Sequence, residues 1–249
     1  MALTDQMERQ GHWLFKYRSI LPILIFVLGL YIFIQNEVNP SNWVVEQTAY
    51  ENVYELGCLL VSLLGFFIRV YTVGYTPPNT SGRNTERQVA DVLNTKGIYS
   101  IMRNPLYVGN FFMWLGIAML TGDAWFTISF MLLYFLYYER IIFTEEQFLK
   151  GKFGDTYVKW AAKTPVVVPN FKNFVKSEHK FNWRKVLRQE KNGFAAVFII
   201  FCFFDIIGEQ LKILPEYNII LHVAGSLSIL IYLILKFLKY KTKLLHDPV

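Results

Sequence analysis

Six apolar segments are the feature of this 249-residue sequence that most constrains its fold. A helix needs roughly 17–25 residues to cross a bilayer, and only the third segment, with 16 residues, is marginal. The segments are residues 19–35, 56–75, 105–120, 124–143, 194–211 and 218–237. Within lipid, helices satisfy their own backbone hydrogen bonds. The sequence therefore predicts an all-α, polytopic membrane protein with about six transmembrane helices.

The positive charges fall on one side of this predicted arrangement. Of the 25 lysines and arginines, only Lys212 lies on the opposite side. Because cytoplasmic loops are enriched in Lys and Arg, we expect both termini to be cytoplasmic, in a bacterial inner (cytoplasmic) membrane. The net charge of +6 then reports topology first and attraction to anionic lipid headgroups second. Charges that alternate with membrane segments form no single basic face, so we expect no nucleic-acid partner.

Other polar and sulfur-containing residues inside the predicted spans indicate structural roles. Cys58 and Cys202 both fall within spans, which predicts small buried residues rather than a disulfide or a metal site. Asp205 and Glu209 lie near the end of a span close to Lys212, and we expect a structural ion pair there. The sequence predicts no bound metal and leaves the oligomeric state open.

A polar signature interrupts the apolar sequence at residues 97–109, which read GIYSIMRNPLYVG. Asn104 is a good helix N-cap and Pro105 a favoured first helical residue, so a helix should begin at Pro105. Its first amides would face the cytoplasm, where they could receive an anion. The turn at residues 121–123 then reverses the chain, which gives a short, re-entrant-like hairpin in the membrane.

The signature resumes after the hairpin with Glu145 and Glu146, followed by FGDTY at residues 153–157 and by two prolines, Pro165 and Pro169. Adjacent acids at a helix end are most often a solvated face. Here they directly follow an apolar span, and the hairpin returns them to the side of the membrane that holds Arg103. We therefore expect the acids and Arg103 to share one cytoplasmic pocket.

Together these motifs resemble the isoprenylcysteine carboxyl methyltransferase and phospholipid methyltransferase family over residues 91–169, about a third of the chain. The resemblance implies an integral membrane enzyme that uses S-adenosylmethionine. It assigns cofactor contacts to Tyr99, Arg103, Asn104, Pro105, Tyr107, Glu145 and Glu146, and catalytic roles to Arg103, Asn104 and Glu146. Two positions depart from the family, which commonly has His where this chain has Asn104 and Asp91.

The chemistry of these residue types agrees with that implied cofactor. Carboxylates suit its ammonium, Arg103 or helix amides suit its carboxylate, and tyrosine rings suit its sulfonium. Methyl transfer to an oxygen anion needs no base. Catalysis would come from holding the reactants in line in a dry pocket, which can supply roughly 7–11 kcal/mol.

The predicted acceptor is a membrane lipid or a lipidated substrate with an anionic head, either phosphate or carboxylate. The substrate-binding candidates are Arg83, Arg87, Arg140 and Tyr157. The loop that holds Arg83 and Arg87 could equally be a solvated connector. The alternatives are N-methylation of a phospholipid amine and a non-catalytic transporter or assembly protein, although we find no internal repeat typical of transporters.

The sequence divides into three parts on this interpretation. Residues 1–75 hold the N-terminal transmembrane helices, and residues 76–170 hold the methyltransferase core with its loop, hairpin and paired glutamates. Residues 171–249 hold a basic amphipathic segment, which we expect at the membrane surface, and two C-terminal transmembrane helices.

Overall fold

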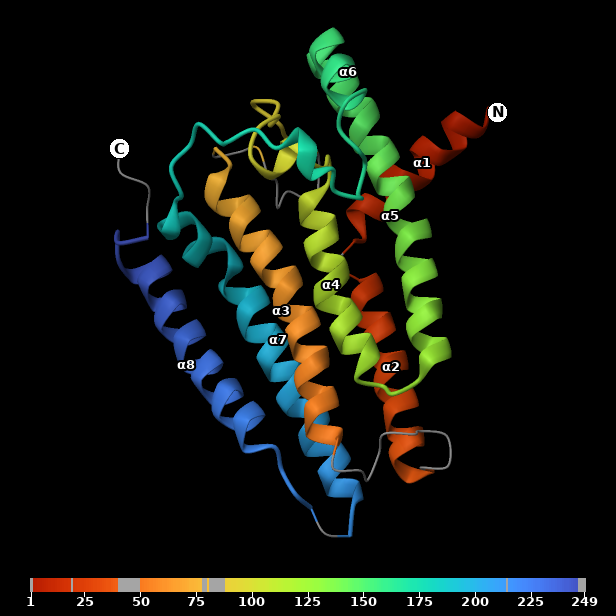
Figure 1. The fold of residues 1–249 in the computed structure, drawn as a ribbon, viewed down its shortest axis with the longest axis vertical. Coiled ribbons are helices and arrows are strands. Elements are labelled where there is room, and N and C mark those ends of the chain that lie inside the picture. The colour runs from red at the N-terminus through yellow and green to blue at the C-terminus, as the bar shows by residue number, and fades with distance from the viewer. Residues whose placement is uncertain are drawn as a thin grey trace.

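The computed structural model describes residues 2–18, 20–39, 50–77, 80, 88–213 and 215–245. These ranges form helices and connecting segments, with one isolated bridge between Gly97 and Val175 and no strand. Figure 1 shows a helical bundle. Its α-helices are α1 (Leu3–Lys16), α2 (Leu21–Val38), α3 (Glu51–Tyr75), α4 (Pro105–Met119), α5 (Ala124–Phe153), α6 (Asp155–Ala161), α7 (Trp183–Leu211) and α8 (Ile219–Lys241).

The bundle confirms the prediction of an all-α, polytopic membrane protein. In the described part of the chain, α3, α5, α7 and α8 are long and apolar enough to cross a membrane, and α2 and α4 are shorter apolar helices. The 15 residues of α4 extend about 22 Å, less than the roughly 30 Å of a bilayer core. The marginal third segment is therefore a short helix, packed between longer ones (Figure 1).

Helix α4 approaches α3 closely because small residues line their contact. A Cβ atom at Gly65 would lie 2.3 Å from the carbonyl oxygen of Gly109, and one at Gly116 would lie 2.3 Å from that of Cys58. The Ser62 hydroxyl donates to the carbonyl of Met113 at 2.8 Å. Small residues allow such backbone contact between helices in a membrane, where burial of apolar surface no longer drives association.

The predicted hairpin is present. Gly122 has a φ of +67° in the turn, and the Asp123 carboxylate caps α5 by accepting from the amide of Phe126 at 2.6 Å. Helix α5 then continues to Phe153, well beyond the apolar segment that ends at residue 143. The helix thus carries Glu145 and Glu146 past the apolar segment in a rigid element.

The basic amphipathic segment expected at the membrane surface comprises residues 172–191, and its second half forms the first turns of α7. Lys185 is only 2% exposed. Its ammonium donates to the carbonyl of Thr76 at 2.7 Å and to that of Pro77 at 3.1 Å, just beyond the end of α3. Unpaired carbonyls at a helix C-terminus attract a cation, which explains why this basic residue is buried.

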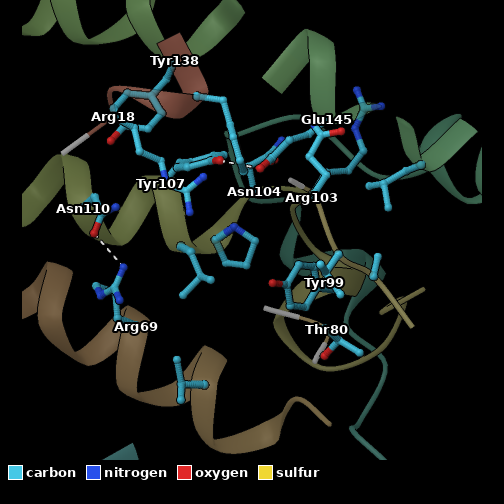
Figure 2. A pocket seen from close by; sticks show the side chains of 18 of the residues that line it. Arg18, Arg69, Thr80, Tyr99, Arg103, Asn104, Tyr107, Asn110, Tyr138 and Glu145 are labelled. Carbon is cyan, nitrogen blue, oxygen red and sulfur yellow. Dashed lines mark hydrogen bonds between the residues drawn. The ribbon is translucent and has the colours of Figure 1, made fainter. Parts of the chain in front are cut away.

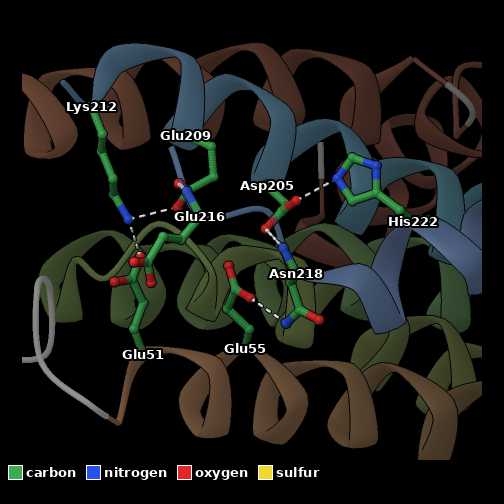
Figure 3. A network of polar contacts seen from close by, with 8 residues as sticks. All are labelled: Glu51, Glu55, Asp205, Glu209, Lys212, Glu216, Asn218 and His222. Carbon is green, nitrogen blue, oxygen red and sulfur yellow. Dashed lines mark hydrogen bonds and ion pairs between the residues drawn. The ribbon is translucent and has the colours of Figure 1, made fainter. Parts of the chain in front are cut away.

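A polar network joins α3, α7 and α8 at the opposite end of the bundle (Figure 3). Lys212 pairs with Glu209 at 2.7 Å and with Glu51 at 2.6 Å. The Asp205 carboxylate lies 2.6 Å from Nε2 of His222. The predicted pairing of Lys212 with an acid of α7 is confirmed, and these partners give the network a structural role.

Candidate active site

A cavity of about 470 Å³ lies at the end of the bundle where α4 begins. This volume is in the range of small-molecule sites, roughly 300–1,000 Å³. Of the residues expected to contact a cofactor, the cavity is lined by Tyr99, Arg103, Asn104, Pro105, Tyr107 and Glu145. Figure 2 shows these side chains around one space. The structure thus brings both halves of the signature to one site.

The segment that precedes α4 is held by the chain that follows α6. The Arg103 amide donates to the carbonyl of Pro165 at 2.8 Å, and the Trp160 indole donates to the carbonyl of Tyr99 at 3.2 Å. Asn104 occupies the N-cap position as predicted, but its side chain makes no cap. Its amide instead donates to the carbonyl of Val166 at 3.1 Å, because the returning chain passes beside it.

Arg103 and Glu146 form an ion pair across the hairpin. The distance from Nη1 of Arg103 to Oε1 of Glu146 is 3.0 Å, and the side chains are 16% and 26% exposed. Arg103 lines the cavity, whereas Glu146 does not. Tyr157 is buried next to this pair. Its burial, and to a lesser extent the nearby Glu146 carboxylate, raise the pKa of its phenol to about 12. Glu146 therefore holds Arg103 rather than facing the cavity.

Glu145 faces the cavity amid tyrosines. The Tyr107 hydroxyl donates to Oε1 of Glu145 at 2.8 Å, and the hydroxyl of Tyr134 donates to the carbonyl of Tyr107 at 2.7 Å. The rings of Tyr107 and Tyr138 lie 4.7 Å apart. Burial raises the pKa of the Tyr99 phenol, so this cavity-lining hydroxyl keeps its proton. A carboxylate beside aromatic rings is suited to bind an organic cation.

Two arginines that the sequence assigned to topology also line the cavity. Arg69 donates from Nε and Nη2 to the Glu190 carboxylate, both at 2.8 Å, and from Nη1 to Asn110 at 2.7 Å. The Arg18 guanidinium lies 3.9 Å from the centre of the Phe15 ring. Arg18 directly precedes one apolar segment and Arg69 lies near the end of another, so their positions in the sequence predicted only the side of the membrane on which they lie. No local signal links Arg69 to Glu190, 121 residues away.

The structure describes two of the four substrate-binding candidates, Arg140 and Tyr157. Arg140 pairs with its neighbour Glu139 at 2.8 Å and does not line the cavity. Tyr157 does not line the cavity and lies beside the Arg103–Glu146 pair. Arg83 and Arg87 lie outside the described residues. In the described ranges, no group of three or more His, Cys, Asp and Glu could hold a metal.

The fold and cavity define an integral membrane protein whose polar site is built by the arginine–proline–tyrosine and paired-glutamate motifs. Residues 53–156 match the sequence model of the phospholipid methyltransferase family. Over this part of the chain, the protein is similar to phospholipid methyltransferases and to protein-S-isoprenylcysteine O-methyltransferases.

Relatives come from eukaryotes and bacteria. Protein-S-isoprenylcysteine O-methyltransferase of Schizosaccharomyces pombe is 34% identical over 120 residues, 47% of this chain and 50% of the relative. The Xenopus laevis protein of that name is 28% identical over 143 residues, 53% of this chain and 49% of the relative. Cobalt-zinc-cadmium resistance protein CzcN of Cupriavidus metallidurans is 35% identical over 79 residues, 32% and 36% of the two chains. The chain thus spans about half the length, or less, of these relatives, and no solved structure matches it significantly.

Proposed function

We propose that this protein is an S-adenosylmethionine-dependent O-methyltransferase that acts on the carboxylate or phosphate head of a membrane lipid or lipidated substrate. The observation that carries the proposal is the single cavity that joins Arg103, held by Glu146, to Glu145, held by Tyr107. The relatives from Schizosaccharomyces pombe and Xenopus laevis are named as methyltransferases of protein isoprenylcysteine, which supports an acceptor with a lipid tail.

The residues of the cavity fit the cofactor. Glu145 offers a carboxylate to the ammonium, and the rings of Tyr107 and Tyr138 offer their faces to the sulfonium. Arg103 has five N–H groups, of which Glu146 engages Nη1, so others are available for the cofactor carboxylate. Glu146 and Tyr157 would then act by fixing the orientation of Arg103.

The reaction requires little acid–base chemistry from the protein. When bound, S-adenosylmethionine supplies a sulfonium methyl group, so the acceptor oxygen forms the C–O bond while the C–S bond breaks and its electron pair stays on sulfur. No proton moves. The chain's own residues bind and orient the two reactants, and the apolar helices exclude water. Asn104, anchored to the chain at Val166, would contribute only to shaping the start of α4.

Charge balance favours an anionic acceptor over an amine. Among the described residues, the formal charges at the cavity and in its ion pair cancel, with three arginines and three glutamates: Arg18, Arg69, Arg103, Glu145, Glu146 and Glu190. S-adenosylmethionine has a net charge of +1, so an acceptor of charge −1 would balance the formal charges of the cofactor and these described residues. An amine would leave excess positive charge in a poorly solvated cavity, which is costly. O-methylation is therefore preferred to N-methylation.

The arrangement of the charges supports an orientation with both termini in the cytoplasm. Helix α1 and the end of α8 lie at the end of the bundle that holds the cavity, and Lys212 lies at the other (Figures 1 and 3). The soluble cofactor would then enter from the cytoplasm and the acceptor from the bilayer. We propose a bacterial inner membrane as the location, and the relative from Cupriavidus metallidurans is consistent with this location.

Binding of radiolabelled S-adenosylmethionine to detergent-purified protein tests the site. Arg103→Ala and Glu146→Gln should weaken binding at least tenfold, whereas Arg184→Ala, an exposed arginine of α7 outside the cavity, should not. Intact binding in both site variants would refute the site.

Methyl transfer is then tested with a farnesylcysteine carboxylate, phosphatidic acid and phosphatidylethanolamine, read by mass spectrometry as the gain of one methyl group. Transfer to either of the first two supports the proposal. Transfer to the amine alone, or to none, contradicts it.

A further inference from the structure

The cavity is lined by a second set of polar residues, Arg18, Arg69 and Asn110, which we call the second cluster. Asn110 accepts from Arg69, and this pair lies on the opposite side of the view in Figure 2 from Arg103 and Tyr99. We propose that this cluster is the subsite for the anionic head of the acceptor, and that Glu190 is the positioning residue that orients Arg69. The proposal rests on the O-methyltransferase function proposed above and names residues outside its signature motifs.

Arg69 is built into the bundle in a way that leaves donors for a ligand. Its guanidinium has five N–H groups, and Glu190 and Asn110 accept three of them at 2.7–2.8 Å. Two N–H groups therefore remain at a side chain that lines the cavity and is 16% exposed. The Glu190 side chain is only 3% exposed, and such a fork-to-fork pair fixes the guanidinium plane.

Arg18 reaches the same region because α1 docks tightly on α5. A Cβ atom at Gly11 would lie 2.3 Å from the carbonyl of Arg140, and the Tyr137 hydroxyl donates to the carbonyl of Leu14 at 3.0 Å. Arg18 then lies over the Phe15 ring at the cavity wall. Arg18 and Arg69 both line the cavity, and both act electrostatically on the phenol of Tyr138.

The wall next to this cluster is apolar, which suits a head attached to a hydrocarbon chain. Pro22 of α2, Val73 of α3 and Trp114 of α4 line the same cavity. Trp114 also lines a small second cavity with Ile25 and other apolar side chains of α2, α4, α5 and α7, deeper in the bundle. The apolar wall at Pro22, Val73 and Trp114 would therefore contact the part of the acceptor next to its head.

Glu190 gives helix α7 a role at the site, because Gln189 and Glu190 both line the cavity. Residue 190 lies beyond the matched family region of residues 53–156, and so does Arg18. The subsite thus combines Arg69 and Asn110 from inside that region with charged residues from outside it. Acceptor selectivity would depend on these added elements.

Equilibrium binding tests the subsite without requiring methyl transfer. The ligands are N-acetyl-S-farnesylcysteine and phosphatidic acid, each compared with its neutral methyl ester (the dimethyl ester of phosphatidic acid for the lipid), in detergent without cofactor. The wild-type protein should bind at least one acid more tightly than its ester. Arg18→Gln, Arg69→Lys and Glu190→Gln should each weaken binding of that acid by roughly 10- to 100-fold and leave ester binding unchanged.

Controls separate the subsite from the fold and from the proposed function. Arg184→Gln should change nothing, since this exposed side chain does not line the cavity. S-adenosylhomocysteine affinity should stay within twofold in all variants, which also reports correct folding. If Glu190→Gln fails to fold, Arg18→Gln still tests the subsite, because Arg18 lies between α1 and α2, outside the helices of the bundle.

Two outcomes overturn the subsite: no preference of the wild-type protein for either acid, or an acid preference that survives Arg18→Gln and Arg69→Lys. The acid that shows the arginine-dependent preference identifies carboxylate or phosphate as the head. Acid binding that depends on both arginines, without methyl transfer to any acceptor, would uphold the subsite and refute only the proposed methyltransferase function.

Discussion

Glu145→Gln offers a quantitative test of the cofactor site. The Tyr107 hydroxyl donates to Oε1 of Glu145 at 2.8 Å, and glutamine keeps the size of the side chain and an oxygen that can accept this hydrogen bond. The substitution removes the carboxylate charge from the cavity. A hydrogen bond to a charged group contributes about 1.5–3 kcal/mol, and each 1.4 kcal/mol is a factor of ten in affinity. Loss of the contact with the cofactor ammonium should therefore weaken S-adenosylhomocysteine binding roughly 10- to 150-fold.

Isothermal titration calorimetry of the detergent-purified protein measures this loss, and a second ligand isolates its cause. Methylthioadenosine lacks the amino-acid end of the cofactor, so its affinity should change less than twofold in Glu145→Gln. Glu139→Gln is the matched protein control, because Glu139 is an exposed acid of α5 paired with Arg140. Equal losses for both ligands, or a loss below about threefold for S-adenosylhomocysteine, would refute the assignment of Glu145 to the ammonium.

Three further predictions concern the framework of the site. Gly116→Leu should lower the free energy of unfolding by about 1–3 kcal/mol, seen as a lower unfolding temperature, because its side chain would meet the backbone of Cys58. Gly57→Leu, with open space around the residue, should leave the unfolding temperature unchanged. Lys185→Met should destabilise the protein by about 2–3 kcal/mol in thermal unfolding, since the carbonyls at the end of α3 lose a charged donor; unchanged stability would contradict this role. The raised pKa of Tyr157, about 12, stabilises the fold below pH 10, the ordinary pKa of a tyrosine, and this contribution is lost as pH rises from 10 through 12; Tyr157→Phe should flatten the decline in unfolding temperature over that range, and an unchanged decline would show that Tyr157 does not cause it.

Much of the fold could be predicted from local patterns. Apolar segments of bilayer length and the alternation of charge gave the helices and their order, because each depends on neighbouring residues alone. The hairpin could also be predicted, since Thr121, Gly122 and Asp123 combine turn and capping chemistry. The start of α7 at Trp183 could not, because the helix extends through basic residues. Lys185 is tolerated there only because the end of α3 supplies its acceptors.

In the candidate site too, the sequence motifs predicted some features and the packing of the helices determined the others. The motifs identified Arg103, Tyr107 and Glu145, yet they left Glu145 and Glu146 equivalent. Adjacent helical residues point about 100° apart, so only the packing of α5 against α4 decided that Glu145 faces the cavity while Glu146 pairs with Arg103.

By itself, the sequence determined a helical membrane protein with a polar signature beside its apolar helices, because hydrophobic length and motif spacing are properties of the chain read in order. Only the tertiary structure decided that Arg18, Arg69 and Glu190 belong to the cavity. Their partners lie on other helices, and the Arg69–Glu190 pair spans 121 residues. Such contacts arise from the way helices pack, which no local pattern encodes.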